Sequence, residues 1–102
     1  MNQQRFRVYY EDTDAGGVVF YANYLKYIER GRTEYLRELG FEQASLGKEK
    51  NIVFVVKSLS ADYISPAYLD DMIEVQTSIE LIKNASLIFA QKILNIEKNT
   101  VL

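Results

Sequence analysis

One run with helical periodicity, residues 24–39, stands among segments that alternate like β-strands, and this combination limits the folds open to the chain. Apolar or small residues recur in the run at three- and four-residue spacing, which gives a helix one face for a core. They are Tyr24, Ile28, Gly31, Tyr35 and Leu39, broadened by Leu25, Tyr27 and Leu36. Gly40 follows where a left-handed residue commonly ends a helix, and Gly31 marks a close approach to a sheet.

Four segments are predicted to be strands, because their side chains alternate or because β-forming residues dominate them. They are residues 4–10, 53–64, 72–81 and 85–96. The third segment has the cleanest alternation, and Lys83-Asn84 then forms the turn of a hairpin with the fourth. The second segment stops at Ser65-Pro66, since proline cannot donate to a ladder. The fourth is apolar on both faces, which suits a central strand and a subunit contact.

The order of these elements is a strand, a long helix and three more strands. It predicts an α+β domain in which an antiparallel sheet wraps around one helix. A chain of 102 residues has room for a single domain. Residues 41–51 are expected to be a polar connection with one short helical turn.

The loop at residues 11–17 carries the features that favour chemistry. Asp12 and Asp14 lie two residues apart, Gly16-Gly17 follows, and Asn23 is placed to be the N-cap of the helix. Backbone N–H groups, the positive end of a helix dipole and an acid would therefore converge there, as in an anion or oxyanion site. Aspartates beside glycines are by themselves most often turn formers.

The residues from Tyr9 to Tyr24 read Tyr-Tyr-Glu-Asp-Thr-Asp-Ala-Gly-Gly-Val-Val-Phe-Tyr-Ala-Asn-Tyr. This stretch resembles the signature of hotdog-fold acyl-CoA thioesterases, and the similarity continues to Glu34. The most similar groups are the 4-hydroxybenzoyl-CoA thioesterases and the acyl-CoA thioesterases linked to the Tol–Pal genes. The resemblance implies that residues 1–102 form one hotdog domain. Hotdog domains usually add a further strand, so we expect this domain to lack most of its last strand, beginning at Thr100-Val101-Leu102.

The resemblance also implies roles for particular residues. Asp14, the second aspartate of Asp-Thr-Asp, is expected to be the nucleophile or general base, while Asp12 bonds N–H groups of the loop. The backbone N–H of Tyr21 is expected to polarise the thioester carbonyl. Tol–Pal-linked members usually carry histidine at this position, so the Tyr21 side chain is expected to tune the choice of acyl group. The residues expected to bind substrate are Gly17, Val18, Asn23 and Lys83, the last through the CoA phosphates.

The residue types that are missing from the chain exclude some kinds of catalytic group and metal ligand. The chain has no histidine, which removes the commonest general base and the commonest metal ligand, and no metal or prosthetic group is expected. It has no cysteine, so thiolate chemistry is excluded and a cytoplasmic location is the default. A net charge of -2 with dispersed basic residues argues against nucleic acid, and no apolar run is long enough to span a bilayer.

The first functional hypothesis is an acyl-CoA thioesterase that forms a homodimer or homotetramer. Family precedent places the active site of such enzymes at a subunit boundary. The residues leave open the acyl group and whether the thioester is carried by CoA or by acyl carrier protein. The alternative is a hotdog domain that binds acyl-CoA or acyl carrier protein without turnover. A hotdog dehydratase is set aside, because those enzymes rely on a catalytic histidine.

Overall fold

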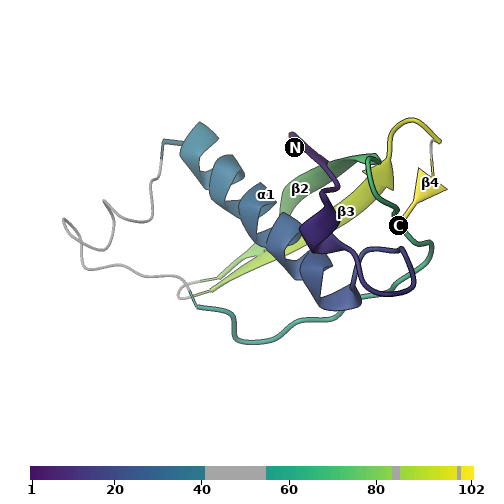
Figure 1. The fold of residues 1–102 in the computed structure, drawn as a ribbon. Helices are drawn as coiled ribbons and strands as arrows, with labels where there is room; N and C mark the ends of the chain where they lie inside the picture. Colours follow the sequence, from purple (N-terminus) through teal and green to yellow (C-terminus); the bar gives the residue numbers. More distant parts are fainter. Residues whose placement is uncertain (41–54, 84–85, 99) are drawn as a thin grey trace.

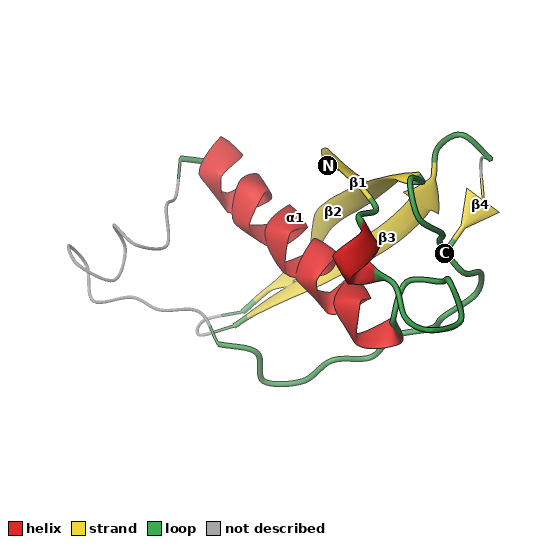
Figure 2. Cartoon of the chain, in the orientation of Figure 1, coloured by secondary structure: helices red, strands yellow, loops and turns green. Residues whose placement is uncertain are grey.

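A computed structural model describes residues 1–40, 55–83, 86–98 and 100–102. One long helix packs across one face of a four-stranded antiparallel sheet (Figure 1, Figure 2). The helix is α1 (Tyr24–Glu38), and the strands are β1 (Asn2–Arg7), β2 (Met72–Ile82), β3 (Leu87–Asn95) and β4 (Thr100–Val101), in spatial order β1-β2-β3-β4. The predicted α+β class and the sheet around a single long helix are confirmed.

The helix turns its predicted face to the sheet. The buried residues of α1 are Tyr24, Tyr27, Gly31 and Leu36. Leu39 lies beyond the last turn and is 49% exposed, so its predicted place in the apolar stripe is wrong. Gly40 follows with φ +95°, the left-handed conformation predicted for the end of the helix.

Gly31 is the point where the helix comes closest to the sheet. A Cβ atom at this position would stand 2.7 Å from Cγ1 of Val75 and 3.1 Å from Oγ1 of Thr77, closer than side chains tolerate. Both neighbours lie on β2 and are fully buried. The predicted close approach is confirmed, because a larger residue would force these buried side chains to shift.

The hairpin of β2 and β3 forms the centre of the sheet. The two strands pair antiparallel from Ile73 opposite Asn95 to Ile82 opposite Leu87, with an irregularity between Ile79 and Leu81. β3 has a strand on each side, as predicted for a central strand. β4 pairs with Leu94 and Asn95 of β3, which agrees with the expectation that a further strand begins at residue 100. The core lies between this sheet and α1.

The first strand is displaced from its predicted bounds. It spans Asn2–Arg7, and Tyr10, the last residue of the predicted strand, lies outside it and is 81% exposed. The chain leaves the ladder because Asp12 Oδ2 accepts the N–H of Tyr9 at 2.9 Å and closes the short 3-10 helix η1 (Tyr10–Asp12). This local capping bond competes with strand pairing.

The strand predicted over residues 53–64 is wrong over its described part. Residues 55–64 belong to no strand, and Val55 and Val56 are 85% and 70% exposed. Within the described chain, the backbone of this segment makes one bond to another segment, from the Ile64 N–H to the Leu102 carbonyl at 3.2 Å. A β-rich sequence without a ladder partner along its length cannot form a strand. Residues 53–54, the predicted connection at 41–51 and Asn84 of the predicted turn lie outside the described residues.

Candidate active site

Asp12 anchors the loop that carries both predicted carboxylates. Its Oδ2 atom accepts hydrogen bonds from the Tyr9 N–H at 2.9 Å and from the Tyr27 hydroxyl at 2.7 Å. Its carbonyl oxygen accepts from the Phe20 N–H at 3.0 Å and from Asn23 Nδ2 at 2.9 Å. Burial, and then the bond to Asp12, raise the pKa of Tyr27, so its phenol stays a donor. These contacts tie one end of the loop to α1.

Asn23 supports this anchored end rather than capping the helix. Asn23 occupies the predicted N-cap position of α1, but its backbone is already helical at φ -71° and ψ -22° and its side chain does not make the expected capping bond. A 3-10 turn, η2 (Tyr21–Asn23), precedes α1 and supplies the first helical turn. The Asn23 amide therefore turns back toward the loop, where it donates to Asp12.

Asp14 lies at the open end of the same loop. Its backbone N–H donates to the Val18 carbonyl at 2.9 Å, and its own carbonyl accepts from the Gly17 N–H at 3.0 Å. Gly17 makes this tight turn with φ +79°. The Asp14 side chain is exposed, and Oδ1 accepts the Gly16 N–H at 2.8 Å. Oδ2 accepts no hydrogen bond from any residue that the structure describes.

The loop joins the helix at Tyr21, the first residue of η2. Phe20, which precedes it, is extended at φ -61° and ψ 132°, so the helical stretch begins abruptly. Within the described ranges, the Tyr21 N–H donates to no protein acceptor, as expected for the first N–H group of a helix. Thr13 and Val19 form an isolated antiparallel bridge, which folds the open end of the loop back toward this junction.

A cavity of about 260 Å³ opens beside the junction. The edge of the Tyr63 ring approaches both Tyr21 and Tyr24, with ring centroids 6.1 and 5.7 Å apart. Tyr24 is fixed, because its hydroxyl oxygen accepts the Ala67 N–H at 3.0 Å, and burial raises its pKa. The residues that line the cavity are Val19, Tyr21, Tyr24, Tyr63, Ile64, Ser65 and Pro66.

Tyr63 is a lining residue that the sequence did not reveal. It lies 42 positions after Tyr21, inside a segment that was predicted to be a strand, so no spacing rule links the two side chains. A tyrosine just before Ser65-Pro66 carries no signal of its own. Only the path of residues 55–64 past the start of the helix brings its ring to the loop.

Lys83 is remote from the other predicted site residues within this chain. Its N–H donates to the Ser86 carbonyl at 2.9 Å and helps to close the β2–β3 hairpin. β2 begins at Met72, next to the segment that packs behind the loop, and ends at Ile82, next to Lys83. The full length of the strand therefore separates Lys83 from the loop. Figure 1 shows the hairpin end and the loop at opposite ends of the sheet. A role of Lys83 toward the CoA phosphates stays a prediction.

Comparison of the sequence with known protein families identifies the family of this chain. A model described as the thioesterase superfamily matches residues 16–102. The chain belongs to the thioesterase superfamily. The acyl-CoA thioesterase YbgC of Haemophilus influenzae is 50% identical over 96 residues, which cover 94% of this chain and 68% of that relative.

Solved structures of thioesterases have the same fold. A probable thioesterase from Bartonella henselae aligns with a TM-score of 0.91 at 35% identity, over 98% of this chain and 82% of the other. The gentisyl-coenzyme A thioesterase BH1999 aligns with a TM-score of 0.89 at 32% identity, over 98% of this chain and 79% of the other. The predicted hotdog fold, the resemblance to thioesterases and the enzyme class of thioester hydrolase are confirmed.

Proposed function

We propose that this member of the thioesterase superfamily hydrolyses an acyl-CoA thioester to a free acid and CoA. The observation that carries the proposal is that two carboxylates of one loop have different environments. The half-buried Asp12 carboxylate accepts two hydrogen bonds, from the Tyr9 N–H and the Tyr27 hydroxyl, and both hold the loop. Asp14 is exposed beside the start of a helix with one oxygen unbonded among the described residues. Relatives named as acyl-CoA thioesterases support CoA as the carrier.

The reaction requires an attacking oxygen and a donor for the charge that develops on the carbonyl oxygen. In one route, the Asp14 carboxylate attacks the thioester carbon, the C–S bond breaks, and water then hydrolyses the acyl anhydride. In the other, Asp14 takes a proton from a water molecule that attacks the same carbon. Both routes release the CoA thiol and a carboxylic acid.

The Tyr21 N–H is the proposed donor to the oxyanion. It is the first N–H group of the helical stretch, where the helix dipole favours negative charge, and it is unpaired within the described chain. Gly17 and Val18 shape the turn that holds Asp14, and we assign them to the substrate-binding wall of the loop. The Tyr21 phenol lines the adjacent cavity, which is the proposed site of the acyl group.

We also propose that the enzyme is a homodimer or a homotetramer. The helix covers one face of the sheet, and Ile88 of β3 remains 41% exposed. Light scattering at micromolar concentration should give a mass of two or four chains, and a monomeric mass would contradict the proposal. A cytoplasmic location and a role for acyl carrier protein stay predictions. None of the described helices has the length and hydropathy needed to cross a membrane.

A free-thiol release assay tests the activity. Short-chain, long-chain and aromatic acyl-CoAs are compared, together with one acyl carrier protein thioester, on the wild-type protein and on Asp14→Asn. Thiol release that depends on Asp14 supports the proposal. Tight binding of acyl-CoA without any thiol release would instead identify a domain that binds the thioester and does not turn it over.

A further inference from the structure

The loop that carries Asp14 is backed by the segment that connects Pro66 to β2. The Val19 N–H donates to the Ala67 carbonyl at 2.8 Å, and Val18 forms an isolated antiparallel bridge with Tyr68. The Asp14 N–H in turn donates to the Val18 carbonyl at 2.9 Å. The position of Asp14 is therefore coupled to that of Tyr68 through two backbone contacts.

Tyr68 is itself held by a side chain. Asp71 Oδ2 accepts the Tyr68 N–H at 2.9 Å, and the Asp71 N–H donates to the Tyr68 carbonyl at 3.1 Å. The turn between them requires a left-handed residue, Asp70, at φ 69°. Residues other than glycine adopt this conformation at a cost, so the surrounding bonds have to maintain it.

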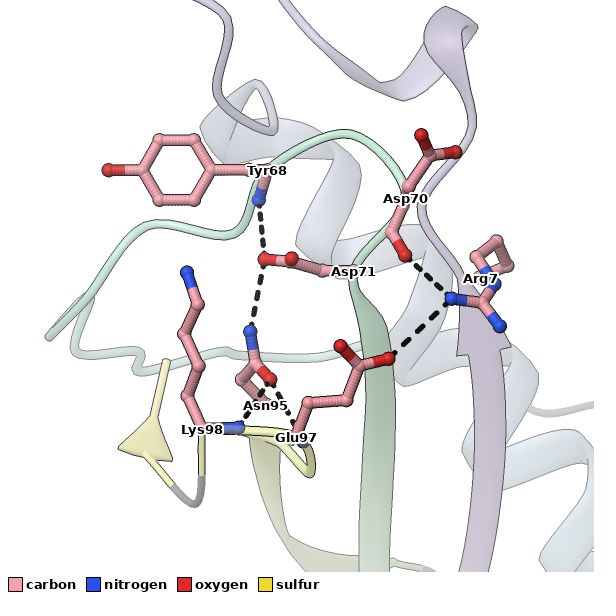
Figure 3. Close-up of polar contacts among 7 residues, drawn as sticks. All are labelled: Arg7, Tyr68, Asp70, Asp71, Asn95, Glu97 and Lys98. Atoms are coloured by element: carbon pink, nitrogen blue, oxygen red, sulfur yellow. Dashed lines mark hydrogen bonds and ion pairs between the residues drawn. The ribbon is translucent and has the colours of Figure 1, made fainter.

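The same carboxylate oxygen joins this turn to the sheet. Asp71 Oδ2 also accepts a hydrogen bond from Asn95 Nδ2 at 3.0 Å (Figure 3). Asn95 is the last residue of β3 and is 1% exposed. Its Oδ1 accepts the N–H groups of Glu97 and Lys98, each at 3.1 Å, so its amide orientation is fixed from both sides.

We infer that Asp71 and Asn95 are positioning residues for the Asp14 loop, a conclusion that rests on the proposed function. The buried Asn95 amide donates to the Asp71 carboxylate, which accepts the Tyr68 N–H. Tyr68 forms a backbone bridge with Val18, and the Val18 carbonyl accepts the Asp14 N–H. A displacement of about 1 Å, transmitted from outside the site, can cost up to about a hundredfold in rate. The pair thus sets the place of the catalytic carboxylate without touching substrate.

A pair of exposed side chains next to the Tyr68–Asp71 turn provides a matched control. Arg7 Nη1 donates to the Asp70 carbonyl at 2.6 Å and lies 3.7 Å from Glu97 Oε1 (Figure 3). The side chains of Arg7 and Glu97 are 44% and 62% exposed. Glu97→Gln removes the charge of the exposed side chain that faces Arg7, and it leaves the bonds between Asp71 and Asn95 in place.

The test compares Asn95→Asp, Asp71→Asn and Glu97→Gln. Asn95→Asp removes the donor and places two acceptors face to face. With the acyl-CoA that the wild type hydrolyses fastest, we expect kcat of Asn95→Asp to fall about tenfold while KM changes less than about threefold. We expect Glu97→Gln to stay within about twofold of wild type.

A second comparison separates this inference from the proposed function. Asn95→Asp is also made in the Asp14→Asn protein, where it should lower the residual rate by less than about twofold, since there is no carboxylate left to position. An equal loss in both backgrounds would overturn the positioning role while leaving Asp14 catalytic. Full activity of Asp14→Asn would overturn the proposed function itself. If Asn95→Asp does not fold, the isosteric Asp71→Asn decides, and kcat equal to that of Glu97→Gln overturns the inference.

Discussion

The two ends of the loop at residues 12–20 are built from similar residues and have opposite characters. At the anchored end, Asp12 makes bonds to the backbone, to an amide and to a phenol on α1. At the open end, Asp14 is exposed and its carboxylate is bonded to one backbone N–H. The half-buried Asp12 carboxylate holds the loop through two hydrogen bonds, whereas the exposed Asp14 carboxylate accepts one and is the proposed catalytic group. The predictions below test this separation.

The largest expected effect is on the open end. Asp14→Asn should lower the rate of thiol release by at least about a hundredfold, or roughly 2.7 kcal/mol of barrier, because the amide keeps the turn but cannot attack or take a proton. The thermal midpoint and acyl-CoA binding should remain those of the wild type. Near wild-type turnover by Asp14→Asn, measured with the best acyl-CoA, would mean that the open end is not the catalytic end.

The matching change at the anchored end should act on stability. Asp12→Asn exchanges charge-assisted bonds from Tyr9 and Tyr27 for neutral ones, which should lower the free energy of unfolding by about 1 kcal/mol. Urea unfolding measures this loss, and kcat per folded molecule should change by less than about threefold. A large fall in kcat with an unchanged unfolding midpoint would show that the two carboxylates have been assigned in the wrong order.

Tyr21 lies at the open end, and its side chain should have a smaller effect than Asp14. The proposed oxyanion donor is its backbone N–H, which any residue except proline supplies. Tyr21→Phe and Tyr21→His should therefore keep kcat with the best substrate within about tenfold, roughly 1.4 kcal/mol of barrier, while the preferred acyl group shifts. The decisive measurement is kcat over a panel of acyl-CoAs. A loss in Tyr21→Phe as large as that in Asp14→Asn, on every substrate, would make the phenol catalytic.

Glu74 is a carboxylate outside the loop, and its substitution is expected to have the smallest effect on the rate of thiol release. It is 6% exposed on β2, and the bond from Gln76, followed by Arg5, lowers its pKa. A carboxylate with a lowered folded pKa contributes stability above its unfolded pKa of about 4.3 and loses it as pH falls through the folded value.

Glu74→Gln should therefore flatten the loss of stability below about pH 4.3 and leave thiol release at neutral pH unchanged. Urea unfolding between acidic and neutral pH measures the slope for both proteins. An unchanged slope would mean that the acid sensitivity does not come from Glu74.

The sequence by itself determined the elements whose signals are local. The spacing from Tyr24 to Leu36, the small residue at Gly31 and the left-handed Gly40 specify α1, and alternation specifies β2. The loop motif was sufficient for the resemblance to thioesterases. These features were predictable because each depends on residues a few positions apart.

Tertiary structure alone decided how the loop is held and what lies beside it. Residues 55–64 have strand-forming side chains, but no strand among the described residues pairs with them, so the prediction from strand propensity is wrong there. Their path brings Tyr63 to Tyr21. Asn23 has the residue type of an N-cap, yet a preceding 3-10 turn turns its amide toward Asp12. The bond between Asp71 and Asn95 joins residues 24 positions apart. No periodicity encodes such contacts, because they form only after the sheet has fixed where separate segments meet.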